Sequence, residues 1–71
     1  MSDLDTARKA AAAHTAAARD LEAFVRGLPE LPGPEHIAEF TALLAREEAV
    51  RAERDEALDA YGLSAPSVEE P

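Results

Sequence analysis

The chain has 71 residues, no cysteine and a formal net charge of −8. This length allows one small domain, and the lack of cysteine excludes disulfide bonds, thiolate metal sites and thiol chemistry. The acidic charge disfavours binding to nucleic-acid phosphates and to anionic membranes, so neither is an expected partner. Because so short a chain buries little surface alone, we expect self-association or a partner protein to add stability.

The first predicted element is a helix over about residues 3–26. Ser2 is expected to cap its start, and Asp3 and Asp5 favour the positive end of the helix dipole. Apolar positions then recur at alternating spacings of three and four, which is a heptad pattern. The pattern consists of Leu4, Ala7, Ala11, His14, Ala18, Leu21, Val25 and Leu28. Gly27 is predicted to end the helix in the left-handed conformation.

A proline-rich turn is predicted over residues 27–34. Its prolines, Pro29, Pro32 and Pro34, exclude regular helix within the turn and favour a stiff, extended connection. A short connection between two helices of similar length predicts an antiparallel hairpin. The alternative is a proline-rich ligand for the aromatic groove of another protein. We favour the structural role, with Leu28 and Leu31 filling the corner of the hairpin.

A second helix is predicted over about residues 35–61, and it carries two apolar faces. One face is bulky and consists of Ile37, Phe40, Leu43, Leu44, Val50, Leu58 and Tyr61. The opposite face consists of Ala38, Ala42, Ala45, Ala49 and Ala52. A hairpin can cover one of these faces, so the other is expected to contact a second protein surface.

The favoured interpretation packs the alanine face on the first helix. Residues whose numbers add to about 63 then face each other, for example Ala18 with Ala45 and Ala11 with Ala52, and small residues on both sides allow close helix approach. The bulky face is left for self-association into a four-helix assembly. The competing arrangement packs the bulky face on the first helix and leaves the alanines in water.

Charged residues at helical spacing interrupt the bulky face. The favoured interpretation of Glu47, Arg51 and Arg54 is a solvated surface group in which Glu47 and Arg51 pair one turn apart. The alternative is that these charges set the register of an interface with a second molecule. The predicted protein interface consists of Ile37, Phe40, Leu43, Leu44, Glu47, Val50, Arg51, Arg54, Leu58 and Tyr61.

No catalytic, cofactor or metal site is predicted. No glycine-rich phosphate loop exists, and no serine has a histidine placed to activate it. Glu35, His36 and Glu39 form an acid and imidazole group that could bind a divalent ion weakly, but a solvated first helical turn is the favoured reading. His14 is the one polar residue in the alanine seam, and we expect a structural role for it. The alternative for His14 is a pH-sensitive contact in the assembly.

The charges and the ends of the chain bear on partners and location. The first helix has no net charge and the second carries −5. Residues 64–71 are expected to form a flexible acidic tail.

No apolar run reaches the ~20 residues of a membrane span, and the N-terminal residues are not expected to form a signal peptide. The alanine and arginine bias suggests a bacterial or phage genome, which predicts a cytoplasmic protein or a virion component.

The predicted fold is therefore an all-α antiparallel two-helix hairpin over residues 1–63, completed into a helical bundle by self-association or by a partner. The predicted function is that of a non-enzymatic structural or assembly protein within an oligomer or a larger complex. The alternative is a small acidic regulatory module, similar to an inhibitor or an antitoxin, that neutralises a basic protein. Neither hypothesis involves a cofactor or a small-molecule substrate.

Overall fold

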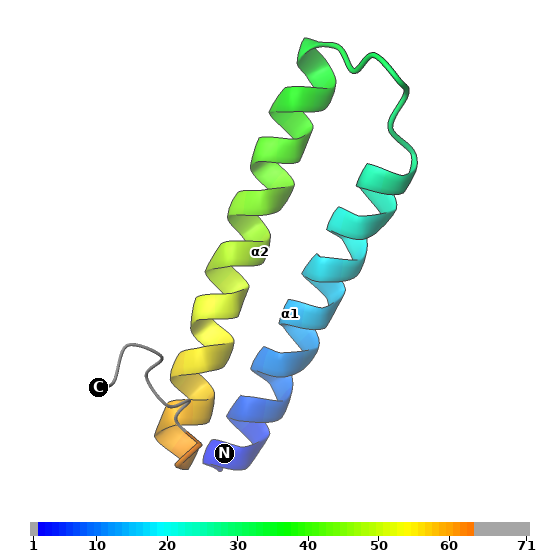
Figure 1. Cartoon of the computed structure of the whole chain (residues 1–71). Helices are drawn as coiled ribbons and strands as arrows, with labels where there is room; N and C mark the ends of the chain where they lie inside the picture. Colours follow the sequence, from blue (N-terminus) through cyan, green and yellow to red (C-terminus); the bar gives the residue numbers. More distant parts are fainter. Residues whose placement is uncertain (1, 64–71) are drawn as a thin grey trace, which may run out of the picture.

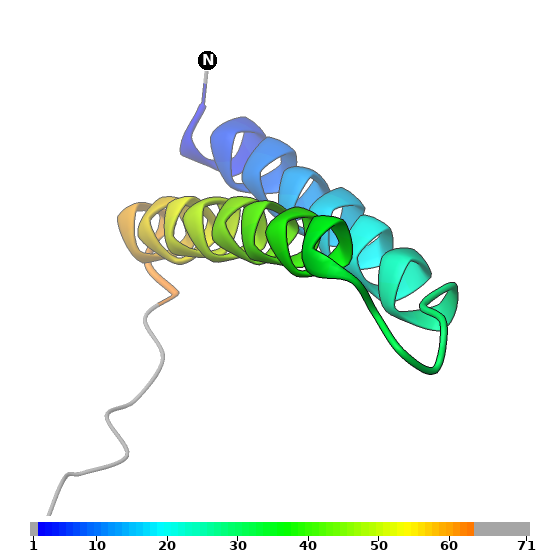
Figure 2. The same ribbon diagram turned by 90° about the horizontal axis from the view of Figure 1, so that it is seen from above.

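The computed structural model describes residues 2–63, which form two α-helices joined by a loop (Figure 1). Helix α1 spans Asp3–Arg26 and helix α2 spans Pro34–Tyr61. The helices lie side by side and run in opposite directions, so α1 begins where α2 ends (Figures 1 and 2). The predicted all-α antiparallel hairpin is confirmed, and the predicted tail over residues 64–71 lies outside the described residues.

The start of α1 follows the expected capping chemistry. Ser2 has an extended backbone, and its Oγ accepts a hydrogen bond of 3.1 Å from the backbone N–H of Asp5. The Ser2 carbonyl also accepts the backbone N–H of Thr6 at 3.1 Å. These bonds satisfy donors that have no partner within the first helical turn. Asp3 and Asp5 in this turn favour the positive end of the helix dipole.

The end of α1 differs from the prediction. Gly27 has a φ of −91°, so the expected left-handed stop at this residue is wrong. Its backbone N–H instead donates to the carbonyls of Ala23 and Phe24, and the N–H of Leu28 donates to the Val25 carbonyl at 3.2 Å. This tight last turn already satisfies several terminal carbonyls. Pro29 then restricts Leu28 to extended conformations, which directs the chain into the loop.

The two ends of α2 are capped in different ways. Pro34 is the first helical residue, where its missing N–H costs nothing. The Nδ1 atom of His36 accepts the backbone N–H of Gly33 at 2.9 Å, so this side chain caps the helix. At the other end Gly62 takes the left-handed conformation with a φ of 113°. The N–H of Leu63 then donates to the Leu58 carbonyl at 2.8 Å, which closes the helix end.

The face of α2 that packs on α1 is the bulky one. Leu43, Leu44, Val50 and Leu58 are half-buried, whereas every alanine of the alanine face is exposed. The favoured packing of alanine against alanine is therefore wrong, because Ala45 and Ala52 face solvent rather than Ala18 and Ala11. The reason is that burying a bulky apolar side chain contributes about 1.5–3 kcal/mol, and alanine offers much less apolar area.

The expected register is nevertheless close. His14 pairs with Glu47 and Asp20 pairs with Arg46, and the numbers in each pair add to within about three of the expected 63. The predicted lengths of the helices and of the loop therefore place the right levels of the hairpin opposite each other. The error concerned the rotation of α2 about its own axis.

The buried centre of the hairpin is small. Within residues 2–63 the buried side chains are those of Ala7 and Ala17, at 3% and 1% exposure. Val25, expected in the seam, is 48% exposed, and Ala17 and Phe24 lie toward α2 instead. The two helices are inclined to each other rather than strictly parallel (Figure 2). Nothing larger than alanine is fully covered in the described part of the chain.

Candidate interaction surface

The largest exposed apolar side chains near the loop surround a hollow between the two helices, here called the loop-end hollow. Its volume is about 330 Å³. The residues that line it are Phe24, Val25, Leu28, Pro32, His36, Ile37 and Phe40. Ile37 is 62% exposed, and Val25 and Phe40 are also exposed. Leu31 at the tip of the loop is 90% exposed, so the predicted plugging of the corner by Leu31 is wrong. This end of the hairpin therefore presents apolar surface to its surroundings.

The ten residues of the predicted interface divide between the inside and the outside of the hairpin. The half-buried members lie on or beside the seam with α1, and they are Leu43, Leu44, Glu47, Val50, Arg54 and Leu58. The exposed members are Ile37, Phe40, Arg51 and Tyr61. Ile37 and Phe40 share the loop-end hollow, whereas Tyr61 lies at the opposite end of α2. The role of all ten in contact with a second molecule stays a prediction.

A cluster of polar side chains crosses the seam at its middle, here called the central polar cluster. The Nε2 atom of His14 lies 2.8 Å from Oε2 of Glu47, and Nδ1 of His14 lies 3.2 Å from an Nη atom of Arg54. Because a guanidinium donates only, His14 Nδ1 is the acceptor, and its Nε2–H donates to the carboxylate. The side chains of His14 and Glu47 are 17% and 14% exposed. The predicted structural role of His14 is consistent with this geometry.

Charged neighbours complete the central polar cluster. The other carboxylate oxygen of Glu47 lies 3.4 Å from Arg51, which is the predicted pair one turn apart. Arg54 donates two further bonds to Asp55, at 2.8 and 3.0 Å. Each part-buried charge therefore has an opposite charge beside it, as buried charges require. Glu47 and Arg54 fix the register of α1 against α2, a role that sequence reasoning missed because their partner lies on the other helix.

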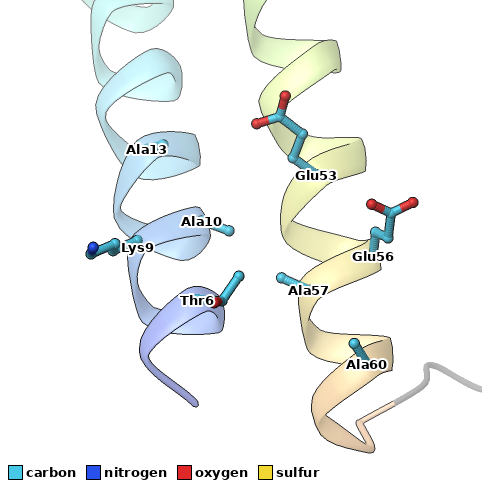
Figure 3. A pocket seen from close by; sticks show the side chains of 8 residues that line it. All are labelled: Thr6, Lys9, Ala10, Ala13, Glu53, Glu56, Ala57 and Ala60. Atoms are coloured by element: carbon cyan, nitrogen blue, oxygen red, sulfur yellow. The ribbon is translucent and has the colours of Figure 1, made fainter. Parts of the chain in front are cut away.

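The opposite end of the hairpin carries a second hollow, shown in Figure 3 and here called the open-end groove. Its volume is about 460 Å³. The residues that line it are Thr6, Lys9, Ala10, Ala13, Glu53, Glu56, Ala57 and Ala60. In the close-up Thr6 and Ala10 point toward Ala57, the side chain of Glu53 extends toward the gap between the helices, and that of Glu56 lies over α2 (Figure 3). The lining therefore combines alanine methyl groups with the polar side chains of Thr6, Lys9, Glu53 and Glu56.

Within the same described range, residues 2–63, no group of three or more histidine, cysteine, aspartate or glutamate side chains is arranged to hold a metal ion. Neither α1 nor α2 is long and apolar enough to cross a membrane. At the start of α2, where the sequence allowed a weak site for a divalent ion, Nδ1 of His36 accepts the backbone N–H of Gly33.

Comparison with protein-family models, with curated proteins and with solved structures finds no match to this chain.

Proposed function

We propose that this chain is a non-enzymatic assembly protein, a helical hairpin that functions by packing against another protein molecule. The observation that supports the proposal is the small buried centre. Only Ala7 and Ala17 are covered among the described residues, while Val25, Leu31, Ile37, Phe40 and Tyr61 remain exposed. Three of them, Val25, Ile37 and Phe40, lie together at the loop-end hollow, and a soluble monomer rarely leaves apolar side chains of this size grouped on its surface.

The free energy of folding also favours assembly with a second molecule. Ordering one residue of backbone costs about 1–2 kcal/mol, and the burial of apolar side chains must offset this cost. Two helices form one layer, and stable domains bury their apolar faces between at least two layers. A second molecule would supply the missing layer and cover the half-buried residues of the seam, Leu43, Val50 and Leu58 among them.

One observation favours a second candidate, the acidic regulatory module. The acids of α2 are mostly exposed, Glu35 and Asp55 among them, and the helix carries a net charge of −5. An exposed acidic helix is suited to a basic protein surface. Under this candidate the mass and the helix content of the chain alone would not change with its concentration. Its complexes with a basic protein would dissociate at high salt because exposed ion pairs are screened.

The mass of the purified full chain in solution, measured by light scattering at low and at high salt, separates the two candidates. Assembly through apolar surface predicts a mass above the 7.6 kDa of one chain, and the mass should persist or increase at high salt. A mass of 7.6 kDa at every concentration and salt, together with complete and stable helix, would contradict the assembly proposal.

A further inference from the structure

We infer that the molecule completing the hairpin is a second copy of this chain, related by a twofold axis that runs along the hairpin and brings the two loop ends together. This inference rests on the proposed assembly function and specifies its partner and geometry. The two flat sides of the helix pair differ in the polarity of their side chains.

One side, here called the apolar face, carries two rows of residues spaced seven apart, which keeps each row on one edge of its helix. The row on α1 is Leu4, Ala11, Ala18 and Val25, and the row on α2 is Ile37, Leu44, Arg51 and Leu58. The loop-end hollow lies at one end of these rows, because Val25 and Ile37 line it. Seven of the eight residues are apolar, and the eighth, Arg51, is paired with Glu47 at 3.4 Å, so this side offers more apolar area to a second molecule than the other side does.

The other side, here called the polar face, is closed by charges. Its rows are Thr6, Ala13 and Asp20 on α1 and Arg46, Glu53 and Ala60 on α2. Arg46 donates to Asp20 across the helices at 2.7 Å, and both side chains are about half exposed to solvent. The open-end groove lies on the same side (Figure 3). A second molecule on the polar face would have to remove solvent from these charges, which costs free energy.

The apolar face is large enough for a stable dimer. The 24 residues of α1 extend about 36 Å, and two helices side by side are about 20 Å wide. The face therefore offers roughly 700 Å², close to the ~800 Å² that each partner buries in an interface of standard size. A second copy matches this length without overhang.

The sizes of the side chains decide the direction of the twofold axis. The row on α1 has two small residues, Ala11 and Ala18, at its centre, whereas the row on α2 is mostly large, with Ile37, Leu44 and Leu58. An axis along the hairpin stacks α1 of one copy on α2 of the other, so Ala18 lies near the level of Leu44 and Ala11 near that of Arg51, and small residues meet large ones at the centre of the interface. An axis across the hairpin would stack α1 on α1 and α2 on α2, which leaves voids at one contact and crowding at the other.

Charge favours the same axis. The helix α2 carries −5 and α1 carries no net charge, so stacking α2 on α1 avoids facing two acidic helices. Arg19 and Glu48, both exposed, lie on the outer edges of the apolar face. Because Asp20 pairs with Arg46, Arg19 and Glu48 lie within about 5 Å of the same height along the hairpin. The proposed axis brings Arg19 of one copy beside Glu48 of the other, twice in each dimer.

Charge reversal tests this contact in the full chain. Arg19→Glu and Glu48→Arg should each weaken the dimer about tenfold, and the double variant should return to within about threefold of the original. Glu39→Arg makes the same charge change as Glu48→Arg at an exposed position seven residues before Arg46, in the same row of the polar face, and should leave the dimer unaffected. Sedimentation equilibrium measures the dissociation constants, and circular dichroism checks that helix is retained. A double variant as weak as either single variant would overturn the proposed contact.

Spin labels test the axis independently, because the chain has no cysteine of its own. A label at Leu31→Cys, in the exposed loop, should report a separation between copies below about 25 Å when the loop ends meet, against about 40 Å, one helix length, when they lie at opposite ends. The long distance overturns the axis while the assembly function stands. A monomer that is partly unfolded overturns the second copy but leaves a different partner open, and a fully folded, stable monomer overturns both.

Discussion

The imidazole of His14 donates to the carboxylate of Glu47 across 2.8 Å and joins two helices at positions 33 residues apart in the chain. The same ring accepts a hydrogen bond from Arg54 at 3.2 Å. The other side chains between the helices are mostly alanine and larger apolar residues. These directional bonds therefore select one register of α1 against α2. Apolar contacts alone would tolerate a shift of one turn, because neighbouring heptads are chemically similar.

Replacing His14 by alanine should destabilise the hairpin. The change leaves the part-buried carboxylate of Glu47 with Arg51 alone and removes the acceptor of Arg54. We expect a loss of about 1–3 kcal/mol in the free energy of unfolding, since a part-buried polar group loses its partner. Glu39→Ala, at an exposed position of α2 away from the central polar cluster, is the control and should change stability by less than about 0.5 kcal/mol. Thermal unfolding at fixed concentration measures both, and equal effects would contradict the role given to His14.

The two helix-ending glycines should respond differently to alanine. Gly62 has a φ of 113°, which an alanine side chain strains even though no atom lies within 4 Å of the added Cβ. Gly62→Ala should therefore cost about 1 kcal/mol. Gly27 has an ordinary φ of −91° and room for a Cβ, with the nearest atom 3.6 Å away. Gly27→Ala should be neutral or slightly stabilising. Urea unfolding of the two variants checks the order, and a larger loss at Gly27 would be inconsistent with the observed helix ends.

A charge placed in the loop-end hollow should weaken assembly. Ile37→Glu introduces a carboxylate among apolar residues that are covered when a second molecule binds, and we expect association to weaken about tenfold or more. Because Ile37 is 62% exposed in the single hairpin, the fold itself should tolerate the change. Ala45→Glu on the exposed back of α2 is matched in charge and should associate as the original chain does. If light scattering gives the same association for both variants, the hollow is not part of the interface.

The sequence predicted the hairpin well because its signals are local. Ser2 and the prolines of the loop each act within a few residues, so the starts of both helices could be placed by local chemistry alone. The register followed from the length of the loop. None of these inferences needed knowledge of distant contacts.

The rotation of α2 could not be predicted in the same way. Its bulky face and its alanine face are both apolar, so periodicity gives two solutions, and the choice depends on how much area each buries against α1. The central polar cluster was missed for a related reason. Glu47 and Arg54 interrupt an apolar face, which suggested an external contact, and nothing local shows that His14 lies opposite them. Gly27 was misassigned because Pro29 controls the path that follows it.

The proposed function requires that one hairpin cannot cover its own apolar surface. The helix content of the full chain, followed on dilution, is the most direct test of this requirement. Circular dichroism over about a 100-fold dilution, with thermal melting at each step, should show helix falling and the melting temperature decreasing as the assembly dissociates. A chain that keeps its full helix at every concentration, and melts cooperatively at one unchanged temperature, would show that the hairpin is stable as a single molecule and would contradict the account.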